Sequence, residues 1–149
     1  MRPGRQSKVS EFPGVLLDTH TWIWLMVEDA RLHHGARRKI EAAAISAAGI
    51  HISAISIWEL GMLRARGRIR LDTTPLEWAR RALTQPGVRL LPLSPEIALL
   101  SSELPGNFHG DPADRILVAS SLLHHLVLVS ADHLILTYGA AHHVRVLPA

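Results

Sequence analysis

A chain of 149 residues with 48% hydrophobic content is long enough to bury the core of one compact domain. It has no cysteine, which excludes disulfides, zinc-thiolate sites and thiol nucleophiles, and no apolar stretch approaches the roughly 20 residues that cross a bilayer. The formal net charge is +3, and 14 of the 16 basic residues are arginines, which is compatible either with a nucleic-acid partner or with a coding bias. These features predict a cytoplasmic protein without membrane contact.

The first part of the chain predicts an extension followed by a folded domain. Residues 1–14 contain two Pro-Gly pairs and little apolar content, so we expect a flexible N-terminal extension, with the domain spanning 15–149. The apolar run at 15–17 predicts a buried strand. The apolar residues between Trp22 and Met26 predict a helix that packs on this strand.

The rest of the chain alternates helices with strands. Helices are expected over 32–48, 55–66, 75–83, from about 95, over 112–124 and over 134–137. Strands are expected over 50–53, 88–93, 127–129 and 144–147. This alternation predicts an α/β fold, a three-layer α/β/α sandwich with a mostly parallel sheet of four to five strands. Ligands bind such sheets outside the carboxyl ends of the strands.

Two acids stand where such a ligand site would form, and a third interrupts an apolar helix face. Asp18 and Asp132 directly follow predicted strands, and Glu59 lies between Trp58 and Leu60. Each has an ordinary explanation by itself, because Asp18 and Asp132 can cap the helices that follow them and Glu59 can face solvent.

Another pair of acids surrounds a predicted helix start. Asp111 and Asp114 are three residues apart, and only one of them is needed as the cap. Asp114 can also form an ion pair with Arg115.

Taken together, these acids predict a site for a divalent metal ion, which none of them predicts alone. A parallel sheet would gather four carboxylate positions at one edge, near the hydroxyls of Thr19 and Ser130. Carboxylate clusters bind Mg²⁺ or Mn²⁺, which can activate water and stabilise the charge that develops in phosphodiester hydrolysis. The sequence has no glycine-rich phosphate loop, no GxGxxG and no GxSxG motif. A phosphoacceptor receiver domain would need a lysine at its site, and Lys8 and Lys39 lie outside the strand ends.

Four segments together closely resemble PIN-domain ribonucleases, and most nearly the VapC toxins of bacterial toxin-antitoxin pairs. They are Leu16-Leu17-Asp18-Thr19-His20, the segment from Ile52 to Leu60, the segment from His109 to Ala119, and Leu128-Val129-Ser130-Ala131-Asp132. The resemblance covers about Val15 to Leu147. It implies a PIN-like fold, Mg²⁺- or Mn²⁺-dependent endoribonuclease activity, a homodimer, and inhibition by a VapB-like antitoxin.

The resemblance also implies roles for individual acids. Asp18 and Glu59 match the first two acids of the family's metal site, and Asp132 matches the later strand-end acid. The third acid is either Asp111 or Asp114, and we favour Asp114 because it begins the helix. Family members often carry a basic residue where this chain has Gly110, which puts substrate contacts in doubt more than the metal site.

Basic and aromatic residues outside the acid positions suggest contacts with a partner. The arginines at 64, 66, 68 and 70 alternate along the chain, and we expect them to contact RNA or the antitoxin, the other interpretation being a surface that only confers solubility. We expect the tryptophans at 22, 24, 58 and 78 to lie in the core or an interface rather than to stack on bases. The alternative to the nuclease is a catalytically silent PIN-like module that binds RNA or a protein.

Overall fold

The computed structural model describes residues 13–141 and 143–149, so residues 1–12 of the expected extension lie outside the described part of the chain. The last two residues assigned to that extension belong to the packed domain. Gly14 is buried, and its carbonyl accepts a hydrogen bond from Val127 N at 3.0 Å. A Cβ on Gly14 would lie 2.9 Å from the Ala48 carbonyl oxygen, so a larger residue would not fit here.

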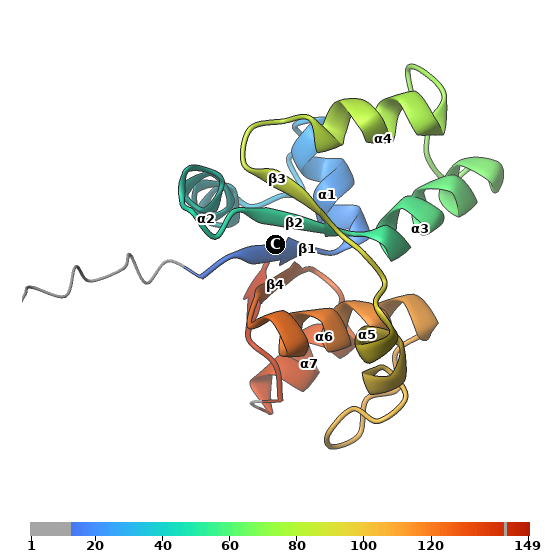
Figure 1. Cartoon of the computed structure of the whole chain (residues 1–149). Helices are drawn as coiled ribbons and strands as arrows, with labels where there is room; N and C mark the ends of the chain where they lie inside the picture. The colour runs from blue at the N-terminus through green and yellow to red at the C-terminus, as the bar shows by residue number, and fades with distance from the viewer. Residues whose placement is uncertain (1–12, 142) are drawn as a thin grey trace, which may run out of the picture.

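Five strands form one parallel sheet in the order β3-β2-β1-β4-β5, which confirms the predicted sheet (Figure 1). Their bounds are β1 Val15–Leu17, β2 Ile50–Ser53, β3 Val88–Leu91, β4 Val127–Ser130 and β5 Val146–Pro148. In register, Leu17 of the central strand pairs with Ile52 on one side and Val129 on the other. The chain moves outward from β1 to β3 and then returns to β4, so the strand order reverses between β1 and β4.

Seven helices connect and cover these strands in the described residues. They are α1 Thr19–Met26, α2 His34–Ile45, α3 Ala54–Ala65, α4 Pro75–Leu83, α5 Pro95–Leu100, α6 Pro112–His124 and α7 His133–Ala140. The helix expected over 32–48 is shorter than predicted at both ends. The His33 side chain accepts a hydrogen bond from Gly35 N and caps α2, and Ser46 closes its last turn by bonding to the Ala43 carbonyl.

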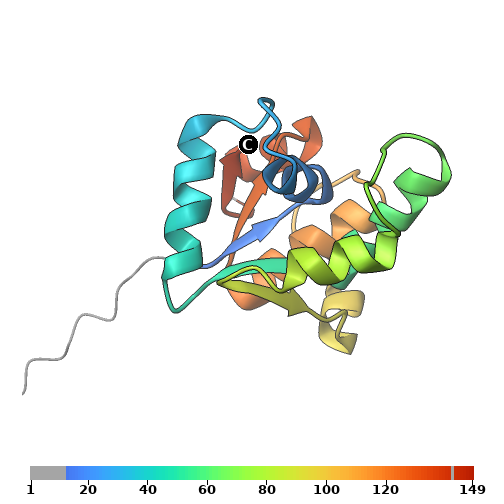
Figure 2. The same ribbon diagram turned by 90° about the horizontal axis from the view of Figure 1, so that it is seen from above.

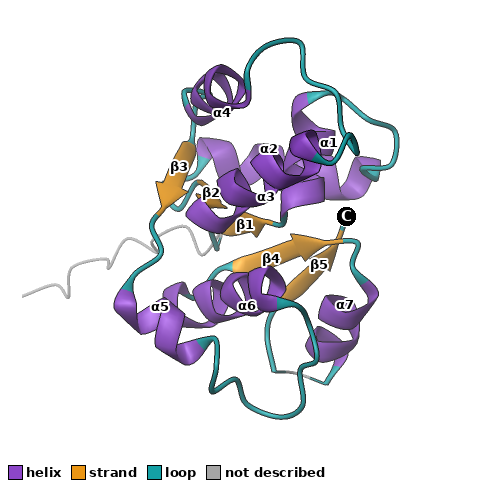
Figure 3. Cartoon of the chain, turned by 90° about the vertical axis from the view of Figure 1, so that its right-hand side faces the viewer, coloured by secondary structure: helices purple, strands orange, loops and turns teal. Residues whose placement is uncertain are grey.

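Helices lie on both faces of the sheet, so the fold is the predicted three-layer α/β/α sandwich (Figures 1 and 3). Side chains alternate along β1, so that Val15 and Leu17 face one core and Leu16 faces the other. Helices α1, α2 and α4 contribute to the first core, and α5, α6 and α7 cover the opposite face (Figures 2 and 3). Because β1 is buried on both faces, it consists of apolar residues only.

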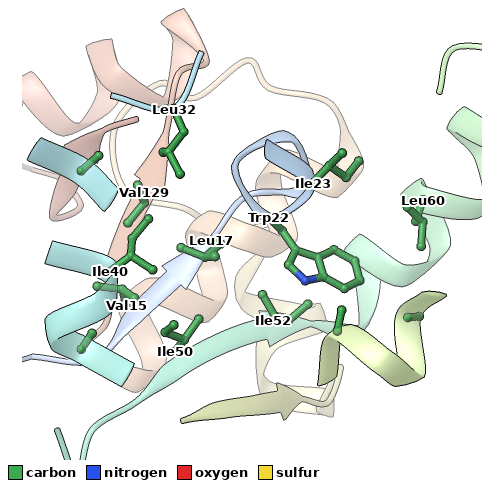
Figure 4. Close-up of a cluster of buried hydrophobic side chains, with 14 of the residues drawn as sticks. Val15, Leu17, Trp22, Ile23, Leu32, Ile40, Ile50, Ile52, Leu60 and Val129 are labelled. Atoms are coloured by element: carbon green, nitrogen blue, oxygen red, sulfur yellow. The ribbon is translucent and has the colours of Figure 1, made fainter. Parts of the chain in front are cut away.

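The first core is built around two tryptophans. Trp22 of α1 and Trp78 of α4 meet edge to face with their ring centroids 5.1 Å apart, and both are almost fully buried. Trp22 lies among Leu17, Ile52 and other apolar side chains of this core (Figure 4). This packing holds the N-terminal end of α1, and therefore Asp18, against the carboxyl end of β1. No helix in the described residues is long and apolar enough to cross a membrane.

Candidate metal centre

Asp18 lies at the point where the strand order reverses, where open α/β sheets bind their ligands. Its side chain is only 6% exposed. Oδ1 accepts a hydrogen bond from Thr21 N at 2.8 Å, so Asp18 does cap α1, and Oδ2 accepts one from the Ser130 hydroxyl at the end of β4. The cap leaves the second oxygen directed toward the neighbouring strand. The helix cap and a role in a site are therefore compatible.

Glu59 reaches the same sheet edge from α3. The Thr19 hydroxyl donates a hydrogen bond to Glu59 Oε1 at 2.6 Å and lies 2.9 Å from the buried Ser56 hydroxyl. Burial raises the pKa of the Glu59 carboxyl, the hydrogen bond from Thr19 opposes this shift, and the charges of Asp111 and Asp18 add to it. Sequence reasoning missed Ser56, although its position three residues before Glu59 places both side chains on one helix face.

The two acids at the start of α6 have different surroundings. Asp111 is exposed, and its Oδ1 accepts a hydrogen bond from Asp114 N at 2.9 Å as the helix cap. Asp114 is half-buried, and burial raises the pKa of its carboxyl to about 7, with Asp111, Asp132, Glu59 and Asp18 contributing in that order. Only Asp114 therefore has a side chain that the cap does not use and that feels the charge of all the other candidate acids.

The alternative interpretation of Asp114, an ion pair with Arg115, is wrong for the described residues. In the described structure the Arg115 guanidinium donates instead to the carbonyl oxygens of Ser101 at 2.7 Å and Phe108 at 2.5 Å. Arg115 thus ties the loop before α6 to the end of α5, because its long side chain reaches back along the loop rather than toward its neighbour. This arginine therefore forms no ion pair with the Asp114 carboxyl.

Asp132 follows β4 and caps α7, with its Oδ1 accepting from Ile135 N at 3.0 Å. Its own backbone N–H donates to the Ser130 hydroxyl at 2.9 Å. Ser130 therefore connects Asp132 with Asp18. The backbone N–H of Asp18 also donates to the Val129 carbonyl at 3.1 Å, which joins the ends of β1 and β4 at this point.

Asp18 and Asp132 directly follow β1 and β4, Glu59 lies in α3, and Asp111 and Asp114 lie at the start of α6. The charges of the other four acids all act on Asp114, and we call these five residues the acidic cluster. Within the described residues, no three histidine, aspartate or glutamate side chains are placed so that they could hold a metal ion together, and the carboxylates of Asp18 and Glu59 accept hydrogen bonds from hydroxyl groups. The donor set nevertheless fits a hard divalent cation, since it consists of carboxylate and hydroxyl oxygens. Burial and then the repulsion from neighbouring acids raise the pKa of Asp114, and such a cation would relieve the repulsion.

The arginines at 64–70 do not form an extended, alternating row. Arg64 lies in the last turn of α3, Arg66 caps this helix, and Gly67 then reverses the chain with a φ of 68°. As a result Arg66 and Arg68 line a small groove beside the acidic cluster, whereas Arg64 and Arg70 are exposed elsewhere.

The four tryptophans divide into buried and exposed side chains. Trp22 and Trp78 lie in the core as expected, and Trp24 is half-buried. Trp58 is 57% exposed, so it does not belong to the core, and of the two expected places only an interface is left for it. A larger groove of about 640 Å³ lies between α6 and β5, and none of the five acids lines it.

Comparison with known proteins gives one consistent result. The profile of the family described as "PIN domain" matches residues 15–139. The chain is 36% identical over 118 residues to Ribonuclease VapC22 of Mycobacterium tuberculosis, a match that covers 79% of this chain and 86% of that protein.

Solved structures of low sequence identity have a similar fold. The structure of VapBC2 from Rickettsia felis bound to a promoter DNA fragment matches with a TM-score of 0.65 and 13% identity, covering 91% of this chain and 98% of that one. DNA-bound VapBC from Salmonella typhimurium also matches with a TM-score of 0.65, at 14% identity and with the same coverage.

Proposed function

Because the chain belongs to the PIN domain family, we propose that it is a metal-dependent endoribonuclease and the toxin of a toxin-antitoxin pair. The observation that carries this proposal is the acidic cluster. Four of its acids, Asp18, Glu59, Asp114 and Asp132, come from separate parts of the chain, and the charges of the other three act on Asp114. Asp18 and Asp132 follow strands at the edge where open sheets of this kind bind ligands, which supports the proposal. The 36% sequence identity to Ribonuclease VapC22 supports RNA as the substrate.

In the proposed site these four acids hold Mg²⁺ or Mn²⁺. The bound ion would lower the pKa of a water molecule and stabilise the charge that develops on the phosphodiester, leaving a 5′-phosphate and a 3′-hydroxyl. The Ser130 and Thr19 hydroxyls hold the carboxylates of Asp18 and Glu59 in place. Asp114, whose pKa is raised to about 7, would have to be deprotonated to hold the ion, so metal affinity should fall as the pH is lowered below about 7.

We propose an antitoxin of the VapB type as the protein partner. The structural neighbours with this fold were solved as toxin-antitoxin complexes, which supports a partner of this kind. A basic side chain of the antitoxin placed among the carboxylates would occupy the position of the metal ion and block cleavage. We expect it to bind across the surface of α1 and the segment 64–70. We expect the protein to meet its RNA substrate and the antitoxin in the cytoplasm.

We also propose that the protein is a homodimer. β3 is an edge strand, and the side chains of Leu90 on this strand, of Leu93 just after it and of Leu99 on α5 expose apolar surface. A second copy would cover this surface and protect the strand from other pairing.

The decisive experiment incubates the pure protein with RNA in Mg²⁺, in Mn²⁺ and in EDTA. Cleavage that requires the metal and is lost in Asp18→Asn supports the nuclease. Binding of RNA without cleavage in either metal would favour the catalytically silent module. The toxin role is tested separately: expression of the chain alone should arrest bacterial growth, and co-expression of the product of the neighbouring gene should restore it.

A further inference from the structure

A small groove lies directly beside the acidic cluster, between α3 and α6. We call it the Trp58 groove. It has a volume of about 270 Å³ and is lined by Trp58, Glu59, Met62, Leu63, Arg66, Arg68, Asp111, Pro112 and Ala113. In Figure 3 α3 lies above the strands and α6 below them, and residues from both elements line the groove. Two of the lining residues, Glu59 and Asp111, also belong to the acidic cluster, so whatever occupies the groove is adjacent to the proposed metal.

Trp58 gives the groove an exposed aromatic surface. Its side chain is 57% exposed, whereas Trp22 and Trp78 of the same domain are 1% and 4% exposed. An exposed indole on a rigid helix can stack on a nucleobase without first being ordered. Met62, one turn further along α3, adds an apolar side chain to the lining of the groove.

Two arginines give the groove a positive end. Gly67 lies between Arg66 and Arg68 in a left-handed conformation, and both arginines line the same groove. The ion pairs that form in the described residues are Arg31 with Asp29 and Arg81 with Asp72, so neither groove arginine is neutralised by a carboxylate there. Guanidinium groups of this kind match the paired oxygens of a phosphate.

We propose that the Trp58 groove is a nucleotide subsite for single-stranded RNA next to the scissile phosphate, with a base stacked on Trp58 and a backbone phosphate bound by Arg66 and Arg68. The proposal rests on the proposed nuclease function. The charges favour RNA as the occupant, because a polyanion can bind the two arginines while its next phosphate reaches the metal among the acids. The volume is slightly below the roughly 300 Å³ at which ligand sites begin, which suits one nucleotide.

The test measures RNA binding in EDTA and RNA cleavage in Mn²⁺ with the same variants of the full chain. The binding probe is a labelled single-stranded RNA of mixed sequence, followed by fluorescence anisotropy and by quenching of tryptophan emission. Trp58→Ala should weaken binding at least about fivefold and raise KM with little change in kcat, since a base stack is lost. Trp58→Phe should bind like the wild type but lose most of the quenching. Leu76→Ala is the matched control, because Leu76 is equally exposed and lies outside the groove.

The arginine contacts are tested by the salt dependence of binding. Arg66→Ala and Arg68→Ala should each reduce the slope of log K against log salt by about 0.7, as expected for one phosphate contact on a single strand. Arg64→Ala and Arg70→Ala serve as controls of equal charge change, and they should leave the slope close to that of the wild type.

The outcomes separate this proposal from the nuclease. Trp58→Ala that binds and cleaves within twofold of Leu76→Ala would overturn the subsite while the nuclease stands. Trp58-dependent RNA binding without cleavage in either metal would support the subsite and refute the nuclease. Tryptophan emission that responds to the antitoxin and not to RNA would also overturn the subsite, and it would assign the groove to the protein partner.

Discussion

Replacing Asp114 by asparagine should stabilise the metal-free protein at neutral and alkaline pH. The pKa of Asp114 is raised from 3.8 to about 7, first by burial and then by four neighbouring acids, so the folded state disfavours its charged form. A shift of this size corresponds to at most about 4 kcal/mol. The partial exposure of Asp114 makes the actual gain smaller than this value. The substitution also removes a favourable negative charge from the first turn of α6, which costs about 0.3 to 1 kcal/mol. We therefore expect a gain of about 1 to 3 kcal/mol in the free energy of unfolding.

The size of this stabilisation depends on pH. Between about pH 4 and pH 7 the folded protein holds the Asp114 proton that the unfolded chain has released, so the wild type loses stability as the pH rises through this window. Asp114→Asn removes that loss. Urea denaturation in EDTA at pH 4.5 and pH 8 should show a difference between variant and wild type at pH 8 that largely disappears at pH 4.5.

A control and a second measurement make the test specific. Asp29→Asn is the control, since the hydrogen bonds from Arg31 lower the pKa of Asp29 to about 2 and its replacement should give no stabilisation. Added Mn²⁺ should raise the Tm of the wild type more than that of Asp114→Asn, because the variant has lost a proposed ligand. An Asp114→Asn protein that is less stable than the wild type at pH 8 would refute the raised pKa of Asp114, and one that gains as much from Mn²⁺ would refute Asp114 as a metal ligand.

Three further changes probe other members of the site. Asp18→Asn should abolish metal-dependent cleavage but keep its fold, because Oδ1 of the amide can still accept from Thr21 N; a properly folded variant with wild-type rates would contradict the assignment. Asp111→Ala should lower the free energy of unfolding by about 0.5 to 2 kcal/mol through the lost cap and retain cleavage, and the reverse pattern would make Asp111 the ligand in place of Asp114. Thr19→Val removes the hydrogen bond that lowers the pKa of Glu59, so the acidic limb of the pH–rate profile should move to higher pH; an unchanged profile would show that Glu59 does not set this limb.

Local signals account for most of what could be predicted about the helices. Thr74 followed by Pro75, and Asp111 followed by Pro112, are a capping residue and a first-turn proline, and both helices begin where this pattern places them. The end of α2 carried no such signal. The alanine-rich run continues to Ala48, but a hydrogen bond between Ser46 and the Ala43 carbonyl ends the helix at Ile45.

By itself the sequence determined the buried strands, the parallel sheet and the acids at the strand ends, because strand burial on both faces requires a continuous apolar run and the acid directly follows it. Only the tertiary structure decided which of two neighbouring acids feels the others, since Asp111 and Asp114 differ in orientation and burial rather than in residue type. It also decided that Arg115 ties a loop and that Trp58 stays exposed beside two arginines. Such contacts join residues that are distant in the chain, and no local pattern encodes them.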